Sequence, residues 1–91
     1  MFFEEQNKLS DETKDMKRAI DSLKEEFEAV DSYNQRANAI SNPELKQILQ
    51  HNADEEKEHA AMLLEWIRRN DSAMEHELKD WLFTNKAFKH D

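Results

Sequence analysis

The 91-residue sequence contains no cysteine, no glycine and only one proline. The lack of cysteine excludes disulfides, Fe–S clusters, thiolate zinc sites and a cysteine nucleophile. The lack of glycine excludes the phosphate-binding loops of kinases, P-loop NTPases and dinucleotide-binding domains, because their tight turns need a residue without a Cβ. Any bound metal must therefore be held by oxygen and imidazole ligands.

Long hydrophobic runs and excess positive charge are also missing. No apolar stretch approaches the ~20 residues of a membrane span, and the phenylalanines at positions 2 and 3 lead into Glu4 and Glu5 rather than into a signal-peptide core. Acidic residues outnumber basic ones by 21 to 13, which gives a net charge of -8. Such a balance repels nucleic acids and anionic lipids and attracts cations. We expect a cytoplasmic protein that binds neither nucleic acid nor membrane.

Hydrophobic periodicity predicts an all-α chain with two long antiparallel helices and a short C-terminal helix. The first helix begins near residue 11, after Ser10 as its cap, and carries an apolar stripe of Met16, Ile20, Leu23, Phe27 and Val30. The chain turns at residues 41–43, and the second helix carries Leu45, Leu49, Ala53, Ala60, Leu63 and Ile67 before ending near residue 70. The third apolar patch consists of Met74, Leu78, Trp81, Leu82 and Phe83.

The chain is too small and too polar to bury these stripes alone. A domain of this size buries only about 60 to 65% of its unfolded surface, and charged residues make up 37% of the sequence. Two antiparallel helices cannot cover each other's apolar stripes, so we expect two chains to pair into a four-helix bundle. We assign residues 1–9 as a flexible N-terminus, 10–84 as the helical domain and 85–91 as a C-terminal tail.

Two acidic residues lie on the apolar sides of the long helices. At about 100° per residue, Glu56 falls in the middle of the second stripe, His59 lies about 60° away on the same side, and Glu26 faces the packed side of the first helix. Burying an ionised carboxylate without a partner costs several kcal/mol, and no lysine or arginine of these helices points inward. A metal is therefore the most natural counter-charge, and oxygen ligands with one imidazole suit iron, manganese or zinc.

These three residues form half of a known ligand set. Ferritin-like di-iron bundles use one glutamate from each of two helices and a Glu-x-x-His pair from each of the other two. Glu26 is the lone glutamate and Glu56 with His59 is the pair, so the set is completed only when two chains pair. Bridging carboxylates hold two metal ions about 3.5 to 4 Å apart, a geometry that suits oxidation of Fe(II) by O2.

Each of these features also has an ordinary structural interpretation. Glu-x-x-His occurs by chance on solvated acidic helices. Tyr33 is either a neighbour of the metal or a core tyrosine with a bonded hydroxyl, and Glu25 and Glu28 are either ordinary acidic surface or a funnel for cations. The remaining histidines, which we expect at the surface, are His51, His76 and His90.

Many further positions resemble the encapsulated ferritins. The similarity runs from about residue 10 to residue 84 and covers residues 25–31, Tyr33, 35–36, 51–52, 54–62, 64–69 and 82–84. Members of that family are half-ferritins, which pair into a four-helix bundle with a di-iron ferroxidase centre and assemble further as five dimers in a ring. Their mineral is stored inside a surrounding encapsulin shell.

The resemblance implies a homodimer that assembles into a decameric ring inside an encapsulin nanocompartment. It also implies that Glu26, Glu56 and His59 bind two iron ions per dimer interface, with manganese or zinc as substitutes. Tyr33 would lie near the centre, and Glu25 and Glu28 would form the site where iron is taken up. The implied activity is that of a ferroxidase, which oxidises Fe(II) to Fe(III) with O2.

Two departures from the family pattern stand out. Ser32 occupies a position where the family commonly has tryptophan, which puts the packing around Tyr33 in question. Encapsulated members usually continue into a linker and a shell-docking peptide, whereas this sequence ends at Lys89-His90-Asp91. Either the sequence has been shortened or the chain is not shell cargo. The alternatives to ferroxidase are another di-iron or di-manganese activity, such as peroxide reduction, and an acidic helical adaptor without metal chemistry.

Overall fold

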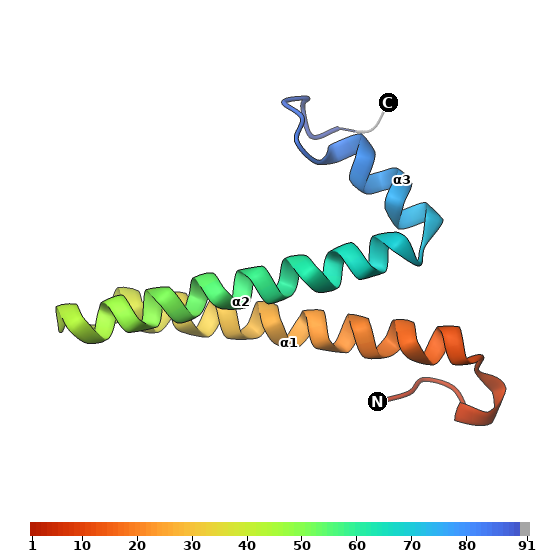
Figure 1. The fold of residues 1–91 in the computed structure, drawn as a ribbon, viewed down its shortest axis with the longest axis horizontal. Coiled ribbons are helices and arrows are strands. Elements are labelled where there is room, and N and C mark those ends of the chain that lie inside the picture. The colour runs from red at the N-terminus through yellow and green to blue at the C-terminus, as the bar shows by residue number, and fades with distance from the viewer. Residues whose placement is uncertain (90–91) are drawn as a thin grey trace.

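The computed structural model describes residues 1–89 and is helical, with no strand in that range (Figure 1). A short 3-10 turn, η1 (Gln6–Lys8), precedes two long antiparallel helices, α1 (Asp11–Ala39) and α2 (Pro43–Arg69). A shorter helix, α3 (Ser72–Trp81), turns away from the pair. The predicted all-α class with two long helices and one short helix is confirmed. None of these helices combines the length and apolarity needed to cross a bilayer.

Side-chain caps explain where the helices begin. Ser10 Oγ accepts a hydrogen bond from the Thr13 backbone N–H at 3.1 Å, as predicted for the start of α1. Asn42 Oδ1 accepts from the Leu45 N–H at 3.0 Å, with proline at the first position of α2. Asp71 Oδ1 accepts from the Met74 N–H at 3.0 Å and starts α3.

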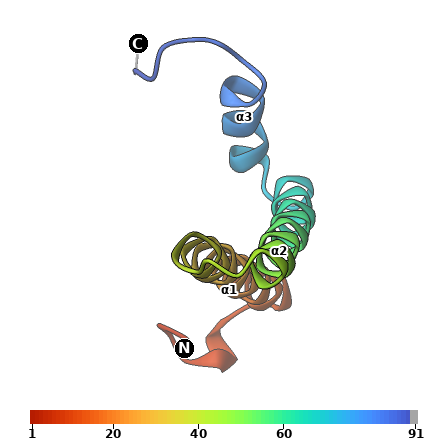
Figure 2. The same ribbon diagram turned by 90° about the vertical axis from the view of Figure 1, so that its left-hand side faces the viewer.

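The interface between α1 and α2 is narrow and made mostly of small side chains. Its buried residues are Ala19, Ala37, Ala53, Ala60 and Ile67. Figure 2 shows why so little is buried: two long helices lie side by side, and within residues 1–89 the third helix, α3, turns away instead of packing along the pair. Large members of the predicted stripes are consequently exposed in a single chain, Phe27 at 56% and Leu45 at 47%.

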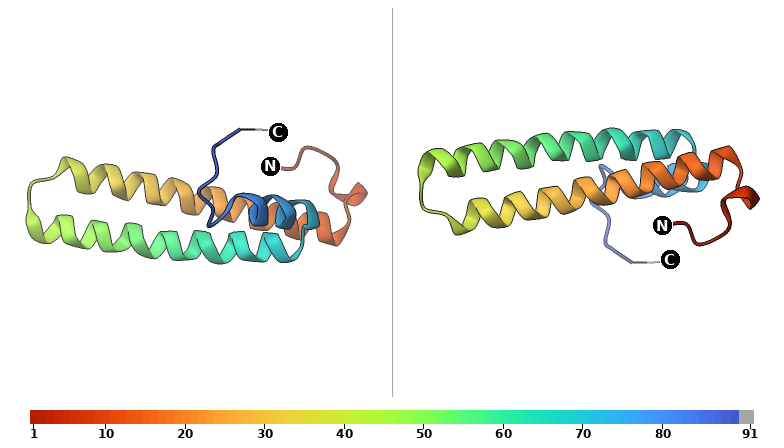
Figure 3. Two further views of the ribbon diagram at one scale, coloured as in Figure 1. Left: turned by 90° about the horizontal axis from the view of Figure 1, so that it is seen from above. Right: turned by 90° about the horizontal axis from the view of Figure 1, so that it is seen from below.

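Exposed apolar side chains lie on two different sides of the helix pair. At about 100° per residue, Ile48 and Trp66 lie about 120° around α2 from Ala60, which faces α1. Ile20 and Phe27 lie about 80 to 100° around α1 from its buried alanines, and because the helices are antiparallel this places them on the opposite side of the pair. The views from above and below in Figure 3 show both flanks of the two long helices.

An ion-pair network fixes the junction between α2 and α3. Arg68 bonds to Glu65 at 2.6 and 2.7 Å and reaches across to Glu75 of α3 at 3.2 Å. Arg69 also bonds to Glu65, at 2.7 Å. Hydrogen bonding from Arg68, and then from Arg69, lowers the pKa of Glu65 to about 2.

We expect Glu65→Gln to lower the melting temperature at pH 7 but not near pH 2. The folded state holds the pKa of Glu65 below its ordinary value of 4.5. Its stabilisation is therefore present above about pH 4.5 and is lost as the pH falls towards 2. Thermal melts at both pH values measure the difference, with Glu77→Gln, an exposed residue of α3, as the control. An equal effect at the two pH values would contradict the assignment.

Candidate metal centre

The antiparallel packing of α1 and α2 brings Glu26, Glu56 and His59 together. Glu56 and His59 lie one turn apart on α2, and Glu26 approaches them from α1. One ligand atom from each residue lies within 4.8 Å of the others. Within residues 1–89 no other group of three such side chains is this close. All three residues were candidates from the sequence, and the structure places them in one cluster.

The contacts inside the cluster leave one oxygen without a partner. His59 Nδ1 lies 3.3 Å from Glu56 Oε2 and 3.6 Å from Glu26 Oε2. Glu26 Oε2 is buried and makes no hydrogen bond within the described residues. An unpaired buried carboxylate oxygen is costly unless a proton or a cation satisfies it. Two carboxylates, one imidazole and an oxygen without a partner fit a hard divalent cation.

The pKa shifts within the cluster also favour the binding of a cation. Close approach to Glu56, and then burial, raises the pKa of Glu26. Contact with Glu26, and then with His59, lowers the pKa of Glu56. These opposite shifts are those expected of two adjacent carboxylates, which resist ionising together. A bound cation would remove the repulsion between them.

His59 is less enclosed than the sequence predicts. Its side chain is 50% exposed, whereas the side chains of Glu26 and Glu56 are 25% exposed. Burial alone would lower the pKa of His59, but the hydrogen bond to Glu56 and the charge of Glu26 outweigh burial and raise it. The cause of the exposure is rotation: α2 turns Ala53 and Ala60 towards α1, so His59 points to the open flank.

His59 shares that flank with two large apolar residues. Ile48 and Trp66 fall within about 20° of His59 around α2 and are 56% and 38% exposed. Ile48 is not among the residues predicted from the sequence, because it lies off the stripe centred on Glu56. Its position three helical turns before His59, on the same side of the helix, was the signal in the sequence that could have identified it.

The other candidate residues lie outside the cluster. Tyr33 is half-buried, with the Arg36 guanidinium 5.8 Å from its ring centroid, and Ser32 beside it is also half-buried. Glu25 and Glu28 are exposed on α1. Of the histidines expected at the surface, His51 is exposed and pairs with Glu55 at 2.8 Å, His76 is exposed, and His90 lies outside the described residues.

Comparison with known proteins identifies relatives of this chain. The EncFtn-like family profile matches residues 1–85. An encapsulated ferritin-like protein of Rhodospirillum rubrum is 58% identical over 76 residues, covering 84% of this chain and 54% of the relative. A ferritin-like protein of Thermotoga maritima is 47% identical over 85 residues, covering 93% of this chain and 75% of the relative.

The chain thus spans about half the length of the first relative. A Nitrosomonas europaea protein of known crystal structure is 68% identical and superposes with a TM-score of 0.92, covering 98% of both chains. Together with the helical architecture, these matches show that the chain belongs to the EncFtn-like family of encapsulated ferritin-like proteins, as its sequence resemblance predicts.

Proposed function

We propose that two copies of this chain form a ferroxidase, which oxidises Fe(II) to Fe(III) with O2 at a di-iron centre between them. Membership of a ferritin-like family indicates an iron-related function. The observation that carries the finer assignment is the cluster of Glu26, Glu56 and His59, with its buried oxygen lacking a partner.

A single chain supplies too few ligands for two ions. Its cluster offers two carboxylates and one imidazole, whereas a ferritin-like di-iron centre uses four carboxylates and two imidazoles. His59 lies on the flank that also exposes Ile48 and Trp66. Burying those apolar side chains against a second copy about a twofold axis would bring the second set of ligands to the first.

Each residue has a distinct role in the proposed site. Glu26 and Glu56 bind the two iron substrates and neutralise their charge, at least one pair of carboxylates bridging the ions. His59 binds through a neutral ring nitrogen, so protons compete with iron at low pH. Each Fe(II) gives up one electron, and the pair of electrons reduces O2, which takes up two protons to become H2O2. Tyr33 lies along α1 from Glu26, and the exposed Glu25 and Glu28 supply negative charge where iron is taken up.

The proposed biological setting is iron storage. The chain would assemble as a decameric ring of dimers and deliver Fe(III) inside an encapsulin shell in the cytoplasm, with manganese or zinc able to replace iron at the site. The support is family membership and the word "encapsulated" in the name of a relative.

Stopped-flow oxidation of Fe(II), with O2 consumption recorded in parallel, tests the function. We expect metal-free protein to bind two Fe(II) per pair of chains under anaerobic conditions and to oxidise them rapidly when O2 is added. Faster oxidation with H2O2 than with O2 would indicate peroxide reduction instead. If the protein binds no iron specifically, the remaining alternative is an acidic helical adaptor without metal chemistry.

A further inference from the structure

The candidate metal centre has an exposed methionine as its neighbour along α2. Met62 lies three residues after His59, and side chains at this spacing on a helix are adjacent, with about 5 to 6 Å between their Cβ atoms. Methionine is more often buried, yet Met62 is 65% exposed. At about 100° per residue it lies about 60° around α2 from His59, on the side turned away from α1. A thioether therefore lies in contact with water beside the proposed ligands.

Met62 lies at the edge of the flank that is proposed to pair with a second copy. Ile48 and Trp66, the large apolar residues of that flank, lie about 120° around α2 from Ala60, whereas Met62 lies about 160° from it. In the proposed pair Ile48 and Trp66 are therefore central, and Met62 is at the boundary with solvent. A small molecule that leaves the centre along this boundary passes the thioether before it reaches bulk water.

A thioether beside a source of peroxide is a target for oxidation. In the proposed function, the reduction of O2 by two Fe(II) ions yields H2O2. Transfer of one oxygen atom from H2O2 to Met62 Sδ breaks the O–O bond and forms an S–O bond. The sulfur loses two electrons, and the second oxygen leaves as water with both protons. The product is methionine sulfoxide, which methionine sulfoxide reductases convert back to methionine.

We propose that Met62 is a modification site, which reacts with peroxide formed at the neighbouring centre and is converted to methionine sulfoxide. This inference rests on the proposed function, because the di-iron centre supplies the peroxide. The other three methionines are placed differently. Met16 lies about 15 Å along α1 from Glu26, and Met74 belongs to α3. Met1 is 88% exposed, so exposure alone would favour Met1 over Met62.

Peptide mapping by mass spectrometry after one round of iron oxidation tests the proposal. Metal-free protein is loaded anaerobically with two Fe(II) per pair of chains and then given O2, with catalase present to destroy peroxide that reaches the solution. A second sample without iron or catalase receives H2O2 until the same total amount of sulfoxide has formed. We expect the ratio of sulfoxide at Met62 to that at Met1 and Met74 to be at least about tenfold higher in the iron sample, because a reactant formed nearby acts at a high effective concentration.

The oxidation of Fe(II) is recorded in the same iron sample. Equal sulfoxide ratios in the two samples, with rapid oxidation of Fe(II), would overturn the reaction at Met62 and leave the ferroxidase intact. Failure to oxidise Fe(II) would overturn both the proposed function and the modification site.

Two variants separate nearness to the centre from exposure. Met62→Leu conserves volume and removes the sulfur, so Fe(II) should be oxidised at the wild-type rate, while the H2O2 released without catalase rises by about the amount of sulfoxide lost. Ala61→Met, added to the Met62→Leu chain, places a thioether at an exposed position about 160° around α2 from His59. This thioether should be oxidised no more than Met74. Oxidation of the introduced thioether to the extent seen at Met62 in the wild type would show that exposure decides the reaction, and would overturn the proposal.

Discussion

Glu56→Ala is expected to slow the oxidation of Fe(II) by at least about a hundredfold. Loss of a residue that only supports a metal ligand typically costs 10- to 100-fold in activity or metal affinity, and Glu56 is proposed as a ligand itself. Its loss also removes the carboxylate that lies beside both Glu26 and His59. Stopped-flow kinetics, with oxygen consumption recorded in parallel, measures the rate.

Two companion variants make this result specific. Glu58→Ala removes an exposed acid two residues along the same helix and should leave the rate unchanged. His59→Ala should cripple oxidation, because it removes the only imidazole near the carboxylates within residues 1–89. Full activity in either Glu56→Ala or His59→Ala would contradict the proposed metal centre.

Local signals in the sequence were sufficient to predict the helices. Ser10, Asn42 and Pro43 mark helix starts through backbone chemistry that acts within one turn, and α1 and α2 begin where those residues predict. The third helix is less well defined by its pattern. Leu82 and Phe83 continue the apolar patch but lie beyond Trp81, where α3 ends. Hydrophobicity alone does not distinguish a residue that packs within its own chain from one that is exposed on the surface of that chain.

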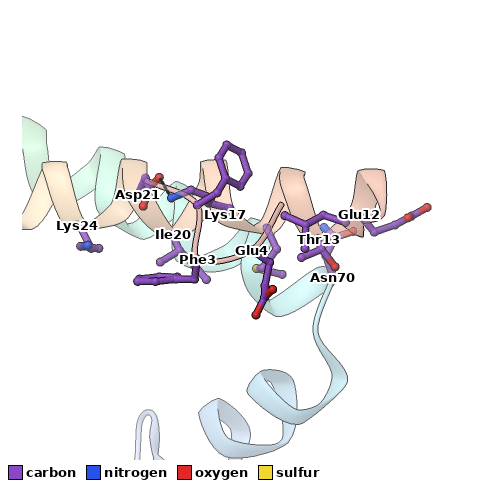
Figure 4. A pocket seen from close by; sticks show the side chains of 12 residues that line it. Phe3, Glu4, Glu12, Thr13, Lys17, Ile20, Asp21, Lys24 and Asn70 are labelled. Atoms are coloured by element: carbon purple, nitrogen blue, oxygen red, sulfur yellow. Dashed lines mark hydrogen bonds and ion pairs between the residues drawn. The ribbon is translucent and has the colours of Figure 1, made fainter. Parts of the chain in front are cut away.

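The close approach of the three candidate ligands was predictable because it depends on helical phase. Glu26, Glu56 and His59 were chosen by their angle to the apolar stripes, and the structure brings all three together. The exact rotation of α2 was not predictable, because it depends on how closely the alanines let the two helices approach. That rotation is what leaves His59 on the open flank. The open apolar groove that Phe2, Phe3 and Leu9 form with the start of α1 (Figure 4) was also missed, because it depends on the N-terminal segment folding back along α1.

Ile48→Glu is expected to abolish oxidation at low protein concentration although every ligand remains. Ile48 lies on the flank of His59 and is 56% exposed in a single chain. If that flank pairs with a second copy, the new carboxylate is buried without a partner. Such burial costs several kcal/mol, which corresponds to at least about a hundredfold weaker pairing.

The decisive measurement is the rate per chain as the protein concentration is raised. For Ile48→Glu the rate per chain should rise with concentration, because the active species is a pair and mass action restores it. Gln47→Glu adds the same charge at an exposed position about 100° around α2 and should behave as the wild type. Sedimentation velocity run in parallel should show smaller assemblies for Ile48→Glu than for the wild type and Gln47→Glu. Monomers that oxidise Fe(II) at the full rate would place a complete site within one chain, and the pairing of two half-sets would then be wrong.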